Sequence, residues 1–475
     1  MTKNNEEIMS VLDFAYRELR KWDMRNASND NPVAALTFFV FLKYVSDNKE
    51  DLKLKYEEKY NFDYLVLLFG EKIEHAELVS HVSSIEKQLG FNYGILESFA
   101  DGLDLKKFNR QTTEILQAIN SLDLKAEEGN HSAYHSLVSY ISMQSKKELR
   151  FAGEFISDVN LSRLMAEIAD IKNGMSLYDF AAGYGISLSE ASKDKDVVVA
   201  AQDITKVCAA LSIMLLTMSG NSGAEVRCDD SISNPLTMMG GEENLTFDRV
   251  ISAPPFGVRR SIEDAMIQSG QQANAFEYGL AYKLTGDLVF ARHLLASLNE
   301  NGIGILQMPM GSLFRSGMEE KIRTQMIEDN YIDAIIELPS GIVAGTNIKT
   351  ALVVFKKNRA NNDVYFLDLA RDGAKDYVER ISRVGTSITE AGLVVINKLM
   401  SERKEVEGLS RLVDRAEIIE NGSNLCPGVY LQQSLSETLE VQDLTPLLKN
   451  NEVLQNKLLH LNSRFIEVLA KMQED

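Results

Sequence analysis

The sequence is poor in cysteine and has no long uninterrupted hydrophobic run. Its 475 residues include three cysteines, which are widely separated. An odd and scattered set supports neither a disulfide framework nor the paired spacing of a zinc site, and a reducing cytoplasm is the expected setting. The polar first residues lack the apolar core of a signal peptide, and the most apolar early run ends at Lys43, after about ten residues. We therefore expect a cytoplasmic protein without a membrane-spanning segment.

Positive charge is also scarce. Lysine and arginine number 50 against 69 acidic residues, a formal net charge of −19. A compact basic nucleic-acid-binding domain is therefore not expected, and any contact with DNA would be local or shared with another chain. The apolar fraction of 45% is that of an ordinary globular protein with a large core. The length predicts two to four folding units, at roughly 100–200 residues each.

Three regions differ in pattern. Residues 1–145 carry apolar side chains at helical spacing and predict an all-helical N-terminal domain. Residues 146–375 alternate short β-branched runs with helical stretches, and residues 376–475 form a mixed C-terminal region that ends in a helix. His131 and His135 lie one helical turn apart, but no further ligands accompany them, so we expect no metal site.

The alternating middle region predicts an α/β fold with a Rossmann-like, doubly wound sheet. Short apolar strands separated by helices are typical of parallel pairing through right-handed crossovers. Such sheets bind ligands beyond the carboxyl ends of their strands. The expected strands are residues 176–178, 197–201, 226–228, 249–252, 303–307, 332–337 and 351–355, and the expected helices are residues 207–218, 287–298 and 319–329.

Three acidic residues and a glycine turn follow successive strands. Asp179 ends the first strand, and Gly183 and Gly185 follow it in a turn where a ligand could approach the backbone. Asp203 ends the second strand, 20 residues after Gly183, where it could accept hydrogen bonds from ribose hydroxyls. Asp230 follows the third strand and could accept from an adenine amine. Because the third glycine of a phosphate-binding loop is missing, a nucleoside fits better than a dinucleotide.

A second motif follows the fourth strand, where Pro254, Pro255 and Phe256 come directly after Ala253. Consecutive prolines cannot continue a sheet, so they fix a rigid turn at its carboxyl end. Phe256 would project into the cleft, where it could stack on a base, although core packing is the usual role of a single phenylalanine.

Together these motifs resemble the amino-methyltransferases that act on DNA bases with S-adenosylmethionine. The chain is similar in particular to the modification (methyltransferase) subunits of type I restriction–modification systems. The resemblance covers residues 153 to about 366 and is looser outside them, although the order of parts also matches. It implies that residues 146–375 form the catalytic domain. Further segments that carry the resemblance are residues 153–155, 285–287, 302–314, 337–339 and 346–350.

The resemblance also implies roles for individual residues toward S-adenosylmethionine. The cofactor-binding residues would be Asp179, Gly183 and Gly185 at the methionine part, Asp203 at the ribose, Asp230 at the adenine, and Glu154 in a segment that closes over the cofactor. The Pro-Pro-Phe turn would hold a flipped adenine, with Phe256 stacked on it. Two acceptors, an Asn or Asp side chain and the carbonyl of the first proline, would draw on the amine hydrogens and aim its lone pair at the methyl group.

The sequence departs from that pattern at Ala253, where the family has Asn or Asp. A methyl group accepts no hydrogen bond, and losing one positioned polar group commonly costs about 10²–10³ in rate. Ser252 is a poor substitute because successive strand residues face opposite ways. Another group could replace the acceptor, catalysis could have been lost while the fold was kept, or position 253 could have been changed deliberately. Phe180 and Asp158 also replace prolines of the family pattern.

The resemblance implies partners as well. DNA would be read by a separate specificity subunit, with two copies of this chain to one such subunit and, in a restricting system, a nuclease subunit. Local phosphate contacts are expected from Arg259, Arg260 and Arg315. In the terminal helix, apolar residues recur every seven positions, from Leu447 through Leu461 to Val468. This seam could pack on a specificity subunit or on the chain's own domain.

Two functional hypotheses follow. The first is an S-adenosylmethionine-dependent adenine-specific DNA methyltransferase of a type I restriction–modification system, slowed by Ala253. The second is a catalytically inactive methyltransferase-like subunit that binds cofactor or DNA and serves complex assembly, for instance in phage defence. Ala253 is the residue that separates them.

Overall fold

The computed structural model describes most of the chain in two units, residues 1–431 and 432–475. The described residues are 3–21, 32–71, 75–91, 93–103, 110–126, 131–147, 158–236, 245–258, 286–343, 346–383, 385–431, 455, 457 and 461. Within these ranges no helix has both the length and the apolar character needed to cross a membrane. Of the predicted terminal seam, only Leu461 falls among them, and it is helical and exposed.

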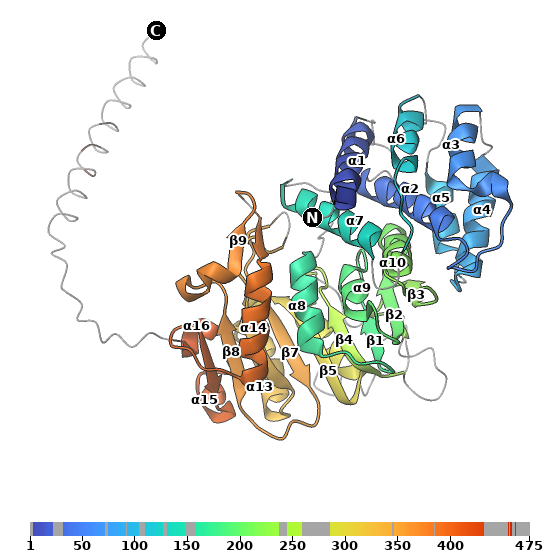
Figure 1. The fold of residues 1–475 in the computed structure, drawn as a ribbon. Helices are drawn as coiled ribbons and strands as arrows, with labels where there is room; N and C mark the ends of the chain where they lie inside the picture. The colour runs from blue at the N-terminus through green and yellow to red at the C-terminus, as the bar shows by residue number, and fades with distance from the viewer. Residues whose placement is uncertain are drawn as a thin grey trace, which may run out of the picture. The chain divides into compact units, whose positions relative to one another are not determined.

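The N-terminal region is helical, as predicted, and its described residues form no strand. The α2 helix is buried on all sides over residues 33–45, which is why its sequence is apolar without a polar face. Helices α2 and α5 contact α10 of the following region, which itself covers β2 and β3, so the bundle packs on the helical layer of the sheet (Figure 1). The helices are α1 (Lys3–Arg20), α2 (Pro32–Asp47), α3 (Phe62–Glu71), α4 (His75–Gln88), α5 (Ile95–Gly102), α6 (Arg110–Asn120) and α7 (Ser132–Lys147), with a 3₁₀ turn η1 (Glu58–Tyr60).

The described part of residues 1–431 contains a nine-stranded, mostly parallel sheet, in the order β11-β8-β6-β7-β5-β4-β1-β2-β3. Each predicted strand and helix of the middle region is present; β6 has the predicted ends, and the others differ by up to five residues at an end. The strands are β1 (Ser176–Asp179), β2 (Val198–Asp203), β3 (Glu225–Cys228), β4 (Phe247–Ser252), β5 (Leu298–Pro309), β6 (Ile332–Glu337), β7 (Thr350–Lys356), β8 (Val364–Asp368) and β11 (Ser410–Val413).

Two strands depart from the expected parallel arrangement. β11, at one end of the sheet, pairs with β8 in the antiparallel direction. β7 lies between β5 and β6 and pairs with both in the antiparallel direction. A parallel neighbour would need a crossover connection, usually a helix, on one face of the sheet. The described residues between β6 and β7 contain no helix, so the chain turns back and inserts β7 beside β6.

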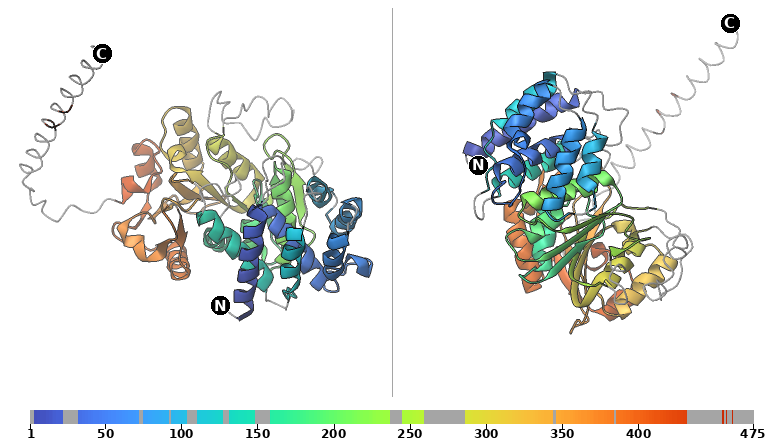
Figure 2. Two further views of the ribbon diagram at one scale, coloured as in Figure 1. Left: turned by 90° about the horizontal axis from the view of Figure 1, so that it is seen from above. Right: turned by 90° about the vertical axis from the view of Figure 1, so that its right-hand side faces the viewer.

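Alternating strand residues contribute to two hydrophobic cores, one on each face of the sheet. Helices lie against both faces (Figure 2). In β1, Leu177 packs into the first core and Tyr178 into the second. The first core is covered by α8 (Val159–Ala169), α9 (Ile186–Ser192), α10 (Lys206–Met218) and α14 (Glu390–Glu402). The second is covered by α12 (Asp287–Ser297), α13 (Met318–Glu328), α15 (Arg415–Glu420) and α16 (Pro427–Tyr430).

The division of the chain at residues 145 and 375 stays a prediction. Segments from the predicted C-terminal region, β11 and α14, belong to the central sheet and to one of its helical layers. A two-stranded hairpin of β9 (Val378–Arg380) and β10 (Thr386–Ile388) follows the 3₁₀ turn η5 (Asp372–Tyr377).

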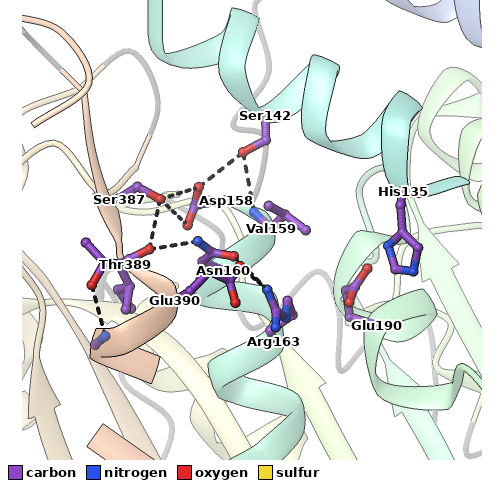
Figure 3. Close-up of polar contacts among 12 residues, drawn as sticks. His135, Ser142, Asp158, Val159, Asn160, Arg163, Glu190, Ser387, Thr389 and Glu390 are labelled. Atoms are coloured by element: carbon purple, nitrogen blue, oxygen red, sulfur yellow. Dashed lines mark hydrogen bonds and ion pairs between the residues drawn. The ribbon is translucent and has the colours of Figure 1, made fainter. Parts of the chain in front are cut away.

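Asp158, one of the departures from the family pattern, joins three parts of the fold (Figure 3). Its buried carboxylate caps α8 by accepting from the Leu161 backbone N–H at 3.0 Å. It also accepts from Ser142 Oγ at 3.1 Å and forms an ion pair with Lys146, both in α7, and accepts from Ser387 Oγ in β10 at 3.2 Å. A buried charge is tolerated only when it is paired and hydrogen-bonded, and Asp158 satisfies both conditions.

Candidate active site

The loops at the carboxyl ends of β1, β2, β3 and β4 enclose one cavity of about 330 Å³. Such a volume lies in the usual range for small-molecule sites. The sequence predicted that these loops meet at a single hollow, and they do. Of the predicted site residues, those that line the cavity are Asp179, Gly183, Asp203, Asp230, Ala253 and Pro255.

Asp179 ends β1 and is buried. Its Oδ1 accepts from Ser252 Oγ at 2.6 Å and from the Ala181 backbone N–H at 2.9 Å. Burial is the main cause that raises the pKa of this carboxyl from 3.8 to about 7; the charge of Asp203 acts in the same direction, and the bonds from Ser252 and Ala181 partly oppose it. The Ser252 hydroxyl thus donates to Asp179. That Ser252 is a poor substitute for the missing acceptor at position 253 stays a prediction.

Asp203 ends β2 and fixes the glycine turn. Its Oδ2 accepts from the Gly183 backbone N–H at 2.9 Å. Its Oδ1 accepts from Thr205, from the backbone N–H at 2.9 Å and from Oγ1 at 3.0 Å. Burial raises the pKa of Asp203. These bonds connect the turn after β1 to the start of α10.

Asp230 follows β3 and takes part in a local turn. Its Oδ1 accepts from the Ile232 backbone N–H at 3.1 Å, and its Oδ2 accepts from Ser233 Oγ at 2.6 Å. A short acidic side chain that bonds to the backbone two residues later is typical of such turns. Asp230 is partly exposed and lines the cavity from the β3 side.

The two glycines of the turn have different surroundings. Both have positive φ, +54° at Gly183 and +75° at Gly185. A Cβ on Gly183 would meet nothing within 4 Å, which leaves room for a ligand at this point. A Cβ on Gly185 would lie 2.9 Å from Ser212 Cα in α10. Gly185 does not line the cavity, and the close approach of α10 explains its lack of a side chain.

We expect Gly185→Ala to destabilise the chain more than Gly183→Ala. Alanine at either position must adopt a left-handed backbone, at a cost of roughly 1–2 kcal/mol. Only at Gly185 does the new methyl group also collide with a helix backbone, which adds roughly 1–3 kcal/mol. Denaturant unfolding of the two variants measures the difference, and equal losses of stability would contradict the packing role.

The Pro-Pro-Phe turn meets the cavity through Ala253 and Pro255. Pro254 is buried and does not line it. Phe256 is half-buried and packs partly against the first hydrophobic core, and it is not among the lining residues. The predicted projection of Phe256 into the cleft is therefore not observed, because core packing occupies part of the ring.

Residues that the sequence did not single out also line the cavity. Phe290 comes from α12, and Cys208 comes from α10. Both lie in apolar stretches of helix, where spacing alone does not distinguish a side chain facing the core from one facing a cavity. For Phe290, the sequence offered one signal: the residue lies close in the chain to Gly286 and Asp287, where the helix begins.

The remaining predicted contacts lie away from the cavity or outside the described residues. Glu154, Arg259 and Arg260 are outside the described part of the chain. Arg315 follows the 3₁₀ turn η4 (Met310–Leu313), and its side chain is 45% exposed. Its Nη1 lies 3.5 Å from a carboxylate oxygen of Glu319.

The cavity is acidic. Asp179, Asp203 and Asp230 line it, and no described lining residue is basic. Carboxylates in a partly desolvated hollow favour a ligand that carries positive charge or hydrogen-bond donors. The arrangement therefore suits a cationic nucleoside better than a phosphate.

The sequence pattern of the N-6 DNA methylase family matches residues 131–438. The chain belongs to this family. The predicted adenine-specific DNA methyltransferase is thereby confirmed at the level of the family, and the comparisons do not favour the alternative of an inactive subunit.

Two relatives of this N-6 DNA methylase align with most of its length. The type I restriction enzyme MpnII methylase subunit of Mycoplasma pneumoniae is 24% identical, over 99% of this chain and 89% of the relative. The MjaVIII methylase subunit of Methanocaldococcus jannaschii is 24% identical, over 89% of this chain and 78% of the relative. These matches confirm the resemblance to type I modification subunits.

Solved structures confirm the fold. The methyltransferase subunit of a type I restriction–modification system from Streptococcus thermophilus has a TM-score of 0.74 at 22% identity and covers 90% of this chain and 100% of its own. A structure described under complex assembly and conformational transition of the type I R-M system has a TM-score of 0.64 at 16% identity, covering 99% of both chains. The Rossmann-like methyltransferase sheet predicted from the sequence is therefore correct.

Proposed function

We propose that this chain is the methyltransferase subunit of a type I restriction–modification enzyme and transfers a methyl group from S-adenosylmethionine to the exocyclic amine of adenine in DNA. The observation that carries the proposal is the common cavity, in which acids from three successive strands meet the rigid Pro-Pro turn. Membership in the N-6 DNA methylase family and the names of the relatives support it.

S-adenosylmethionine supplies a methyl group on a sulfonium. Asp179 is proposed to hold the cationic methionine part, Asp203 the ribose and Asp230 the adenine. The acidic lining and the absence of a basic residue among the described lining positions support this assignment. The open space at Gly183 supports close approach of the cofactor to the backbone, with Gly185 supporting the turn from behind.

The target adenine is proposed to lie against the Pro-Pro-Phe turn. The carbonyl of Pro254 would accept a hydrogen bond from the amine, and Phe256 would stack on the flipped base. Stacking would require Phe256 to leave part of its contact with the core, since it is half-buried there. Ala253 leaves the second acceptor position without a polar group.

DNA and cofactor contacts outside the cavity complete the proposal. Glu154 is proposed to help close over the cofactor, and Arg259, Arg260 and Arg315 are proposed to contact phosphates. A specificity subunit is the proposed partner, with two copies of this chain to one such subunit and a nuclease subunit in restricting systems. The names of the relatives, which are methylase subunits of type I restriction enzymes, support these partners.

Methyl transfer from labelled cofactor tests the proposal. The full chain is assembled with its specificity subunit and incubated with DNA that covers many sequences. We expect transfer that Asp179→Ala abolishes, and we expect the label on the adenine amine. No transfer at any sequence, even by the Ala253→Asn variant, would contradict the proposal.

Deletion of residues 445–475 is expected to weaken assembly and leave residues 1–431 folded. The terminal helix carries the seven-residue apolar repeat, and Leu461 within it is helical and 62% exposed. A seven-residue apolar repeat favours packing against a partner helix. The mass of the purified complex measures the effect, and Leu461→Asp should reproduce part of it. Gln455→Asp, off the seam, is the control, and an unchanged complex mass after deletion would contradict the expectation.

A further inference from the structure

The Pro-Pro-Phe turn is joined to the start of α12 by two hydrogen bonds. The backbone N–H of Gly257, the residue after Phe256, donates to Asp287 Oδ1 at 2.9 Å. The backbone N–H of Gly286 donates to the Val258 carbonyl at 2.7 Å. A Cβ on Gly286 would lie 2.9 Å from that carbonyl oxygen, so the close contact depends on glycine. Gly257 and Val258, which follow the turn, are thus hydrogen-bonded to the start of α12.

Asp287 is an unusual residue for a structural contact. Its side chain is 2% exposed, and its second oxygen, Oδ2, has no hydrogen-bond partner among the described residues. The cation facing that oxygen is Arg315, whose Nη1 is 4.0 Å away. A buried carboxylate with an unsatisfied oxygen is costly to keep. A carboxylate is favoured in the first turn of a helix, and this one also holds the Gly257 N–H.

Arg315 is held in place opposite Asp287. Its guanidinium packs against the backbone of Gly311, where a Cβ would lie 2.5 Å from Nη2. It also faces Glu319 at 3.5 Å, while 45% of its side chain stays exposed. One end of the guanidinium therefore faces the carboxylate behind the turn, and part of the side chain faces solvent.

We propose that Asp287 is a positioning residue that fixes the Pro-Pro-Phe-Gly turn for base binding. Arg315 supports this restraint by holding the Asp287 carboxylate in place. The part concerning the base rests on the proposed function, whereas the restraint on the turn does not. A misplacement of about 1 Å in a binding turn can cost on the order of 10² in rate, so loss of the bond to Gly257 should slow methyl transfer.

Hydrogen–deuterium exchange of the full chain tests the restraint without any activity measurement. Asp287→Ala removes the acceptor and is expected to speed exchange of the Gly257 amide about tenfold or more, as for the loss of one bond to a charged acceptor. Asp287→Asn keeps an acceptor oxygen and should retain most of the protection. Unchanged exchange in the alanine variant, or equal acceleration in both variants, would overturn the proposal.

Asp368→Ala is the matched control. Asp368 is also buried, and its carboxylate likewise accepts from a backbone N–H, that of Ala370 at 3.0 Å, and faces an arginine, Arg371, at 2.8 Å. This control should leave exchange of the turn unchanged. If it accelerates the Gly257 amide as much as Asp287→Ala does, the effect is a general loss of stability and the proposal is wrong.

The link to Arg315 is tested by a double-mutant cycle on the same exchange rate. Arg315→Gln is expected to accelerate the Gly257 amide less than Asp287→Ala, and to add nothing in the Asp287→Ala background. Additive effects would overturn the link. In the assembled enzyme, Asp287→Ala should lower kcat for methyl transfer with little change in cofactor affinity, and Asp287→Asn should recover most of it. An enzyme without any methyl transfer would refute the proposed function, while the exchange measurements would still decide the restraint.

Discussion

Ala253→Asn is expected to raise the rate of methyl transfer by about 10²–10³. Ala253 lines the cavity, directly before the two prolines, so an asparagine there places its amide oxygen beside the Pro-Pro-Phe turn, the proposed site of the base. That oxygen restores the second acceptor for the adenine amine, whose lone pair is otherwise poorly directed at the methyl group. Single-turnover transfer with saturating cofactor and DNA measures the rate without contributions from product release.

Ala253→Leu is the control for this experiment. Leucine has nearly the shape of asparagine and accepts no hydrogen bond, so it should not raise the rate. An increase with both residues would show that filling the space matters rather than the acceptor. No increase with asparagine would mean that another group already supplies the acceptor in this chain.

Asp179→Asn is expected to stabilise the free chain at pH 8. The carboxyl has a pKa of about 7 in the folded state against 3.8 as the ordinary value. A raised pKa contributes stability below pH 4, and that contribution is lost as the pH rises through 7. At about 1.4 kcal/mol per pKa unit, the ionised Asp179 costs the folded state on the order of 4 kcal/mol at pH 8. Asparagine carries no charge and removes that cost.

Thermal unfolding at pH 4 and pH 8 measures this effect. The variant should unfold at a higher temperature than the parent at pH 8, with the difference shrinking toward pH 4. Asp368→Asn is the control, because Asp368 is buried but paired with Arg371, and its loss should destabilise the chain. A less stable Asp179→Asn chain at pH 8 would contradict the expectation.

Asp179→Asn should also weaken cofactor binding, by a factor of about 10² or more. Hydrogen bonds and ion pairs to a desolvated charge are worth roughly 3 kcal/mol or more. A site that is costly in the free chain and needed for the ligand is the expected result of selection for binding rather than for stability. For the parent chain, calorimetric titration should show cofactor affinity rising with pH through about 7, as Asp179 ionises. An affinity independent of pH between 6 and 8 would count against contact between Asp179 and the cationic part of the cofactor.

The sequence by itself determined the strands β1 to β7, the helices α10, α12 and α13, and the edge of the sheet at which the cavity lies. Parallel strands that are buried on both faces consist of short, mostly apolar runs, which can be recognised in the sequence. Residues 332–337 are an example, and each of them is buried. The acids Asp179, Asp203 and Asp230 each follow a strand, and the carboxyl ends of parallel neighbours must meet. Their convergence on one cavity was therefore predictable.

Only the tertiary structure decided what each side chain touches. The antiparallel insertion of β7, the packing of Gly185 against α10 and the core contact of Phe256 depend on elements that lie far apart in the sequence. The bond from Gly257 to Asp287 is of the same kind. The local sequence predicts which residues are buried and which form turns. The residues that each side chain contacts depend on how distant segments pack together, which is a property of the whole fold.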